Sequence, residues 1–418
     1  MPQSGRWNDE ELAAFEAGLT PENLTAIMRS TWTWDDRALR RDLARLLTAL
    51  RAVGQLEPGS DVQRLVRRRT LHSAAVFLAA VLGPRVIADS GHATSYSFSG
   101  TLARSPWLVG GMDEDRLLRA VGASTEKDEA APSGVELASS PTFAARGLAA
   151  HALSASGDQE VGAELLSKIE AGALSATLAA AEASGSWDPA LVRTRASLDG
   201  SQWFLSGEKY FVPHADTASV LLVIARSTAG PSLFAVEGAA AGLTVSAMQT
   251  IDPTRPLARV QLDEVPAVLV GTEGAGGRLM ARTLDLATTS LAEEQVQGTR
   301  RCLQLAAAAL KAMDGPVGDA ERRYAELWVQ AEVARVLWER ARRLADQVGD
   351  GGVAAAMAHI TCSETFTAVA GVTLQLVGEA GDDMVEEATG LYLRARTSDL
   401  LFGGPALYYE RLLERMDI

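Results

Sequence analysis

The segment from Trp203 to Val270 constrains the fold more than any other part of the chain. Its apolar residues alternate with polar ones or form short runs interrupted by Gly, Pro and Asp, which is typical of β-strands. The flanking sequence is rich in Ala, Leu, Arg and Glu at helical spacing. Because the strand-like runs are short and broken, the segment favours a small antiparallel barrel or sandwich over parallel βαβ units. The pattern therefore predicts a compact β-domain within a helical protein.

Helical periodicity describes most of the remaining chain. Before the β-domain, apolar residues at three-four spacing predict helices at Asp9–Gly18, Asp35–Val53, Val62–Leu82, Thr142–Leu153 and Glu160–Ala171. After it, long helices are expected at Arg278–Met313, Asp319–Val348, Val353–Val377 and Asp383–Glu414. Long helices that pack antiparallel form a bundle. Tyr96–Val109 has no clear period and is interpreted as a loop, and Glu126–Ser140 is interpreted as a polar connector.

These segments predict a mainly α, α+β chain with three parts. They are an N-terminal helical domain at residues 1–177, a middle β-domain at 178–275 and a C-terminal helical bundle at 276–418. A chain of 418 residues is long enough for about two to three domains. The glycine-rich stretch Gly271–Gly277 lacks the spacing and the Lys-Ser/Thr of a phosphate-binding loop, so we interpret it as a strand-to-helix turn.

Composition narrows the classes of partner. The net charge of −14 argues against a nucleic acid, because phosphate backbones are bound by clustered cations. The longest apolar run, Ala74–Gly83, is about half as long as a membrane span, so no membrane partner is expected. Cys302 and Cys362 lie in helical patterns and are expected to be reduced and buried, as in a cytoplasmic protein. The histidines show no metal-ligand spacing, so no metal site is expected.

Several stretches, in the same order along the chain, resemble one enzyme family. They are Ala163–Glu182, Ala183–Arg226, Asp252–Pro266, Gln375–Gly381 (QLVGEAG) and Tyr392–Pro405 (YLRARTSDLLFGGP). Together they resemble the acyl-CoA dehydrogenase superfamily of flavoenzymes, in the form found in actinobacteria. The resemblance implies an N-terminal helical domain, a middle β-domain and a C-terminal four-helix bundle, with FAD between the domains and at a subunit interface.

The resemblance also implies a reaction and an oligomer. In the family, a glutamate removes the α-proton of an acyl thioester while the β-hydrogen leaves as hydride to the flavin. Such a base must face the flavin and be desolvated, so that its pKa approaches the working pH. The thioester is expected on CoA or on an acyl carrier protein. The chain is expected to form a homo- or hetero-oligomer, either a dimer or a tetramer.

The base positions of the family are changed in this chain. The family's Tyr-Glu-Gly-Thr run corresponds to Leu401–Pro405, which places Gly403 where the carboxylate would be. Other members carry the base on the first bundle helix, where this chain has Ala287. Neither residue accepts a proton, so the catalytic residue is unknown. Substitute bases remain open, against the alternative that they are solvated or capping residues: Glu293, Glu294, Glu379, Asp382, Asp383, Tyr408 and Tyr409.

The flavin contacts implied by the resemblance are reduced as well. In the family's Thr-Glu-Pro-x-x-Gly-Ser-Asp loop the threonine is Ala181 and the serine is Trp187, which leaves backbone groups and Ser186. The Trp-Ile-Thr that packs on the flavin becomes Phe211, Val212 and Pro213, and the Arg-x-x-Phe-Gly element is missing at Leu310–Pro316. The Gln-x-x-Gly-Gly-x-Gly turn supplies further candidate FAD-binding residues at Gln375, Gly378 and Gly381. An alternative stays open, in which Phe211 is a core aromatic and the glycines end a helix.

The main hypothesis is an FAD-dependent oxidoreductase that carries out α,β-dehydrogenation of an acyl thioester. Two versions of it tolerate the missing glutamate: a subunit of a mixed oligomer whose partner supplies the base, and an enzyme with a relocated base. The alternatives are a catalytically degenerate or redox-neutral descendant with weak or no FAD binding, and a flavin-dependent monooxygenase on the same fold.

Overall fold

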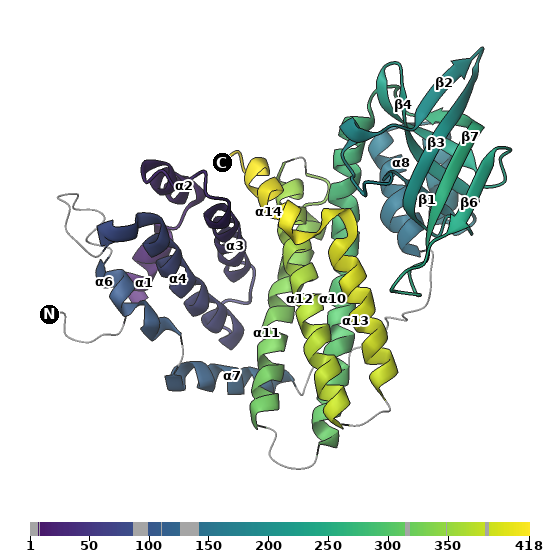
Figure 1. Ribbon diagram of the computed structural model, residues 1–418. Helices are drawn as coiled ribbons and strands as arrows, with labels where there is room; N and C mark the ends of the chain where they lie inside the picture. Colours follow the sequence, from purple (N-terminus) through teal and green to yellow (C-terminus); the bar gives the residue numbers. More distant parts are fainter. Residues whose placement is uncertain are drawn as a thin grey trace.

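The computed structural model describes residues 7, 9–86, 99–109, 111–125, 142–313, 318–347, 349–380 and 384–418. The predicted connector Glu126–Ser140 lies outside these residues, as do Gly381, Asp382 and Asp383. Figure 1 shows the β-domain beside one end of a long helical bundle, with the N-terminal helices on the opposite side of that bundle.

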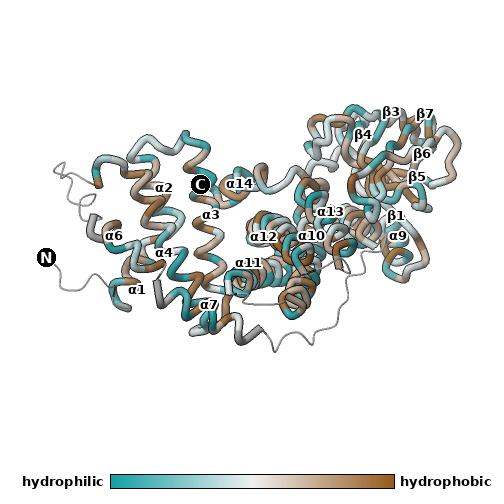
Figure 2. Tube along the Cα trace, turned by 60° about the horizontal axis from the view of Figure 1, so that its bottom comes forward, coloured by the Kyte–Doolittle hydropathy of each residue, from teal (hydrophilic) through white to brown (hydrophobic). Residues whose placement is uncertain are grey.

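The N-terminal helices include the three that were predicted to begin near Asp9, Asp35 and Val62. They are α1 (Asp9–Ala17), α2 (Pro21–Ser30), α3 (Arg37–Val53), α4 (Asp61–Leu82), η1 (Gly83–Val86), α6 (Ser99–Arg104), η2 (Ser105–Leu108) and α7 (Gly111–Thr125). Asp36 and Ser60 cap α3 and α4 through their side-chain oxygens. Hydrophilic and apolar segments alternate along these helices in Figure 2, as expected where one face is buried.

Two expectations for this region are corrected. Helices α2 and α7 were not predicted, although Thr20 caps α2 and Pro21 occupies its first turn. The segment Tyr96–Val109, predicted as a loop, contains α6 and η2. These helices were not predicted because they have too few turns for a helical period to be visible in the sequence. Next come the π-helical turn η3 (Phe143–Ala149), α8 (Ala150–Ser156) and α9 (Val161–Glu170).

The predicted β-barrel is confirmed. Its elements are β1 (Ala176–Ala179), η4 (Pro189–Leu191), β2 (Arg195–Asp199), β3 (Gln202–Pro213), β4 (Val220–Ser227), β5 (Gly230–Glu237), β6 (Leu243–Ala247) and β7 (Leu257–Val270). Hydrogen-bonded pairs run from β4 through β2, β3, β7 and β5 back to β4, which closes the ring. The core inside includes Leu205, Val223, Phe234 and Val260.

The expectation of a purely antiparallel sheet is wrong. β4 is parallel to both β1 and β2. The reason is that β2 and β3 form a hairpin across Gly200, so the chain enters β4 in the direction of β2.

The C-terminal bundle is formed by α10 (Gly276–Ala312), α11 (Gly318–Arg343), α12 (Asp350–Ala380) and α13 (Val385–Leu400). Cys302 and Cys362 are free and buried, as expected. Among the described helices, α12 is long and apolar enough to cross a bilayer, but 56% of its most apolar window is buried inside the protein. A buried central helix of a bundle has this composition too.

The single helix predicted at Asp383–Glu414 is wrong, because it breaks into α13, the turn η6 (Leu401–Gly403) and α14 (Gly404–Arg415). The backbone φ angles are 61° at Phe402, 102° at Gly403 and 67° at Gly404. Residues with positive φ cannot continue a right-handed helix. This break lies at the segment that resembles the family's base-carrying run.

Candidate functional site

The loop after β1, which resembles the family's flavin-side loop, is anchored by a buried ion pair. The Glu182 carboxylate accepts hydrogen bonds from the backbone nitrogens of Arg193 (2.9 Å) and Thr194 (2.8 Å). The Lys209 ammonium, which is fully buried, donates to Glu182 and to the Ala180 carbonyl, both at 3.0 Å. These contacts join β1, β3 and the start of β2, so they fix the shape of the loop.

The pKa values of this pair reflect its environment. Burial alone would raise the pKa of Glu182, but the backbone amides and the Lys209 ammonium lower it to about 2. Burial lowers the pKa of Lys209 to about 8, although Glu182 opposes the shift. The pair is therefore charged at neutral pH and acts as a structural anchor.

A β-bulge in β3 presents an aromatic ring beside this loop. The register against β7 shifts between Lys209 and Val212, and Phe211 has a φ of 57° and an exposed fraction of 41%. The Tyr210 nitrogen donates to the Ala181 carbonyl at 3.0 Å. A Cβ atom on Gly185 would lie 3.8 Å from the Phe211 ring. The barrel side of the predicted site is thus assembled around Phe211.

The other barrel-side candidates differ in access. Val212 is 1% exposed and belongs to the barrel core, so its side chain is not available to a cofactor. The Pro213 carbonyl accepts a hydrogen bond from Thr177 Oγ1 at 2.6 Å. Ser186 accepts one from the Asp188 nitrogen at 3.1 Å, which leaves the hydroxyl hydrogen free to donate elsewhere.

Gln375 and Gly378 lie far from this barrel group. His359 packs on Tyr408 of α14 with ring centroids 4.3 Å apart, at the end of the bundle that carries the base segment. Gly378 lies roughly 28 Å farther along α12, at a rise of 1.5 Å per residue. The Arg323 guanidinium donates to Gln375 Oε1 at 2.8 Å at this second end, where both side chains are exposed. One chain therefore does not bring the two groups of candidates together.

The two base positions, Gly403 and Ala287, carry no carboxylate. The structure also supports a second alignment of the family's Tyr-Glu-Gly-Thr run with this chain. Ala287 is fully buried in α10. A Cβ atom on Gly403 would lie 2.6 Å from Leu407 Cδ2, so a side chain at this position would displace Leu407, and it would be strained at a φ of 102°. Matching the glycine of the motif to Gly403 instead places Phe402 in the position of the carboxylate. The geometry favours that alignment because Phe402 is only 2% exposed and its ring faces the barrel loop.

Phe402 is in contact with Trp187, the residue that replaces the serine of the flavin-side loop. Their ring centroids are 5.0 Å apart with an interplanar angle of 81°, an edge-to-face arrangement. Phe143 adds a third ring, 6.3 Å from Phe402. Two of the positions where the family has a polar residue thus hold aromatic rings in contact. Trp187 was identifiable from the sequence but Phe402 was not, because only the three-dimensional contact relates the two residues.

Three of the described substitute bases are engaged or closed off, whereas Glu293 is partly buried and Glu379 is exposed. Glu294 pairs with Arg255 and, at 3.1 Å, with Arg394. Tyr409 donates to Glu364 at 2.5 Å and accepts from Arg45 at 2.9 Å.

Tyr408 is fully buried, and burial raises its pKa to about 12, which makes it a poor base at neutral pH.

Two further features had no signal in the sequence. Arg394 also pairs with Asp252 at 2.8 Å, so Glu294, Arg255, Arg394 and Asp252 form a buried network between the barrel and the bundle. Asp399 precedes the break after α13, and burial raises its pKa despite the nearby Arg396. Asp399 is therefore the carboxyl group nearest in sequence to the changed base segment.

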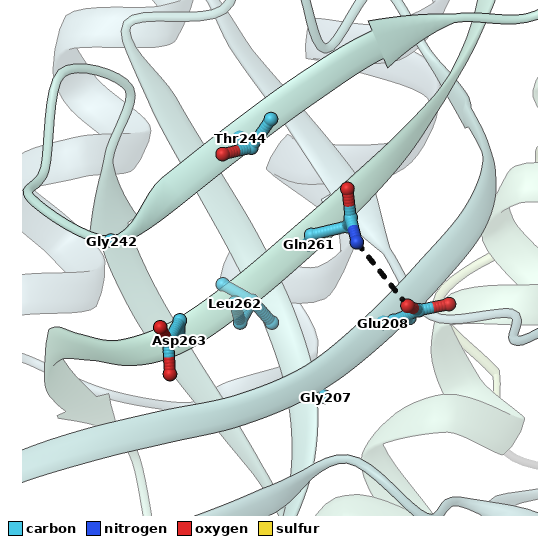
Figure 3. A pocket seen from close by; sticks show the side chains of 7 residues that line it. All are labelled: Gly207, Glu208, Gly242, Thr244, Gln261, Leu262 and Asp263. Carbon is cyan, nitrogen blue, oxygen red and sulfur yellow. Dashed lines mark hydrogen bonds between the residues drawn. The ribbon is translucent and has the colours of Figure 1, made fainter.

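A hollow of about 470 Å³ lies on the barrel between β3, β6 and β7. Figure 3 shows its lining: Gly207, Glu208, Gly242, Thr244, Gln261, Leu262 and Asp263. Glu208 already accepts from Tyr210 (2.8 Å), Arg259 (2.6 Å) and Gln261 (3.4 Å). The lining contains none of the candidate cofactor residues. Within the described residues, no group of three His, Cys, Asp or Glu side chains is placed to hold a metal ion.

Comparison with known protein families identifies the family of this chain. Residues 177–265 match the model of the acyl-CoA dehydrogenase middle domain, and residues 274–416 match that of its C-terminal domain. The chain belongs to the acyl-CoA dehydrogenase superfamily. Members of this family generally bind FAD, use acyl-CoA substrates and form oligomers.

Relatives in the superfamily match only part of the chain. The mitochondrial short-chain specific acyl-CoA dehydrogenase of Bos taurus is 27% identical over 232 residues, which are 52% of this chain and 56% of the relative. Acyl-CoA dehydrogenase FadE12 of Mycobacterium tuberculosis is 28% identical over 240 residues, 51% of this chain and 60% of the relative. The matches thus span less than two-thirds of these relatives.

Solved structures of the superfamily share the fold over nearly the whole chain. A glutaryl-coenzyme A dehydrogenase with bound glutaryl-CoA superposes with a TM-score of 0.60 at 17% identity, covering 99% of this chain and 97% of its own. The ChsE4–ChsE5 complex of Mycobacterium tuberculosis gives 0.59 at 18% identity, with 99% of each chain covered.

The residues of this acyl-CoA dehydrogenase-type chain fit a flavin only on the barrel side. Phe211 offers an exposed ring and Ser186 a hydroxyl donor. Beside this barrel surface, Phe402 of the base segment contacts Trp187 of the flavin-side loop. A bound flavin and a bound thioester would each need a layer of space between these two segments. As a set, these residues do not fit a flavin between the chain's own barrel loop and its own base segment.

Proposed function

We propose that this chain is one subunit of an acyl-CoA dehydrogenase-type assembly that dehydrogenates an acyl thioester of CoA or an acyl carrier protein. A related partner subunit supplies the base and the working flavin cleft. The observation that carries the proposal is the contact of Phe402 with Trp187, at positions where the family uses polar groups, on a scaffold that keeps the family's fold.

The absence of a base has a kinetic consequence. A positioned general base contributes about 10²- to 10⁴-fold to proton abstraction. The nearest candidates by motif, Gly403, Ala287 and Phe402, have no proton-accepting group. Glu294 is engaged by two arginines, Arg255 and Arg394. The isolated chain is therefore expected to be a poor dehydrogenase.

The exposed end of the bundle supports a partner. Gln375 and Gly378 resemble residues that the family uses toward a pyrophosphate, yet they lie at the end of α12 remote from the barrel of the same chain. In the proposed oligomer they serve the cleft of a neighbouring subunit. Arg323 lies beside them and supplies a cation, which the missing Arg-x-x-Phe-Gly element does not.

The test is a reconstitution experiment. The tagged chain is expressed alone and together with each acyl-CoA dehydrogenase-type subunit of its source organism, and complexes are isolated by size exclusion. Reduction of ferrocenium by a panel of acyl-CoAs is then measured for the chain, for the partner and for the complex. We expect a stable mixed oligomer whose rate exceeds that of either subunit. A chain that dehydrogenates alone, or that changes no partner's rate, contradicts the proposal.

The second candidate function is a redox-neutral descendant of the family. The closed Phe402–Trp187 contact favours it, because that contact is incompatible with chemistry in the chain's own cleft. The same experiment separates the candidates, since a redox-neutral descendant raises no dehydrogenation rate in any mixture.

A further inference from the structure

We infer that Trp187 and Phe402 form an aromatic wedge that closes the cleft of this chain, so that neither a flavin nor an acyl thioester enters it. Within the proposed mixed assembly, on which this second step rests, the chemistry then takes place only in the partner's cleft. The chain contributes its bundle and subunit contacts rather than a second active site.

The spacing of the wedge leaves no room for a flat cofactor. Two aromatic groups that enclose a planar ring system lie about 7 Å apart, since each contact needs about 3.5 Å between carbon atoms. The ring centroids of Trp187 and Phe402 are 5.0 Å apart, and the two rings meet edge to face. Phe143 packs on the ring of Phe402, and the Arg255 guanidinium lies 5.1 Å from the centroid of the Phe143 ring. The wedge is therefore backed by a charged group that is itself buried.

Both sides of the wedge are fixed. The loop that carries Trp187 follows Glu182, which is held by Lys209 and by backbone amides. Phe402 lies in a turn with positive φ angles that packs against Leu407 of α14. A bulky residue at positive φ is unusual and persists only where packing determines it. The closed arrangement is thus the resting structure of this chain.

FAD binding to the purified chain tests the wedge without any partner. The variants are Trp187→Ser, Phe402→Ala and the double variant, with Trp107→Ser as the control. Trp107 is 60% exposed in η2, away from the cleft. Binding is measured by calorimetry and by quenching of flavin fluorescence. We expect the wild type and the control to show no saturable binding below about 1 mM FAD. The double variant should bind at least about tenfold more tightly.

Two outcomes overturn the wedge, and a single variant replaces the double variant if the latter does not fold. A wild-type chain that purifies with one FAD per chain overturns it. A double variant that melts cooperatively and gains no FAD binding also overturns it, because removing the rings then opens nothing. If the double variant does not fold, Trp187→Ser alone decides by the same measurement, since Trp187 is only partly buried.

The result is independent of the reconstitution experiment. Failure to find a partner leaves the FAD titration unchanged, while FAD binding by the wild type refutes the wedge and leaves the partner question open.

Discussion

Phe402 offers a sharp test of the broken helix, because two opposing contributions to stability meet at one residue. Its ring is 2% exposed and packs on Trp187 and Phe143, and truncating a buried Phe costs about 3 to 5 kcal/mol. Its φ of 61° lies in the left-handed region, which costs a non-glycine residue about 1 to 2 kcal/mol. Alanine retains this backbone cost, whereas glycine removes it.

We therefore expect Phe402→Ala to lower the free energy of unfolding by about 3 to 5 kcal/mol. Phe402→Gly should be about 1 kcal/mol more stable than Phe402→Ala. The matched control is Phe366, which is 1% exposed in the middle of α12. There glycine should be about 1 kcal/mol less stable than alanine, because a helix interior disfavours it.

The assay is urea unfolding followed by far-ultraviolet circular dichroism for the four variants. The reversed order of Ala and Gly at the two sites is the decisive result. If alanine is the more stable variant at both positions, Phe402 is not held at positive φ, and the explanation of the break between α13 and α14 is refuted.

Three further predictions concern the anchor, the pH response and the exposed bundle end. Lys209→Met should lower the free energy of unfolding by about 2 to 3 kcal/mol in urea, less than for a fully buried pair because Glu182 keeps its amide donors; an unchanged midpoint contradicts the anchor. Burial lowers the pKa of His359 to about 3 and that of His151 to about 4, so the unfolded state binds their protons first and stability falls as pH drops from about 6.5 toward these values. His359→Leu should therefore show a smaller loss between pH 7 and pH 5 than the wild type by about 2 kcal/mol, and an equal loss contradicts the assignment. Arg323→Gln should leave the melting temperature of the isolated chain unchanged but weaken FAD retention by a mixed complex a few-fold, as for an exposed charge; unaltered retention removes Arg323 from the interface with the partner's cofactor.

Periodicity was sufficient to predict the barrel and the bundle, because both are set by local patterns of period 2 and period 3.6. It was not sufficient at Phe402, because apolar residues at helical spacing continue across the break. The signal that could have located the break is Gly403, Gly404 and Pro405, which mark the end of one helix and the start of the next. The parallel pairing of β4 with β1 follows from the path of the chain through an intervening hairpin, which no single strand encodes.

The candidate site was predictable only where it resembled a known motif. Ala181 and Phe211 lie together as expected, since they sit on adjacent segments of one barrel. The contact between Trp187 and Phe402 joins segments from different domains. In the sequence, each of these aromatic residues is equally consistent with an ordinary position in the hydrophobic core. The position of Gln375 at the end of the bundle opposite to Tyr408 likewise became clear only from the length of α12.

The retained and the altered motif residues differ in what they do for folding. Glu182 and Lys209 form a buried ion pair, and removing one partner of such a pair leaves an uncompensated charge and destabilises the whole barrel. The positions now held by Trp187 and Phe402 face a cleft, where polar side chains stabilise a ligand rather than the fold. Apolar replacements there add buried area to the unliganded protein. A subunit whose partner carries the chemistry can therefore accumulate apolar replacements at cleft positions without losing its structure. It cannot accumulate changes in the Glu182–Lys209 pair, because those changes destabilise the barrel.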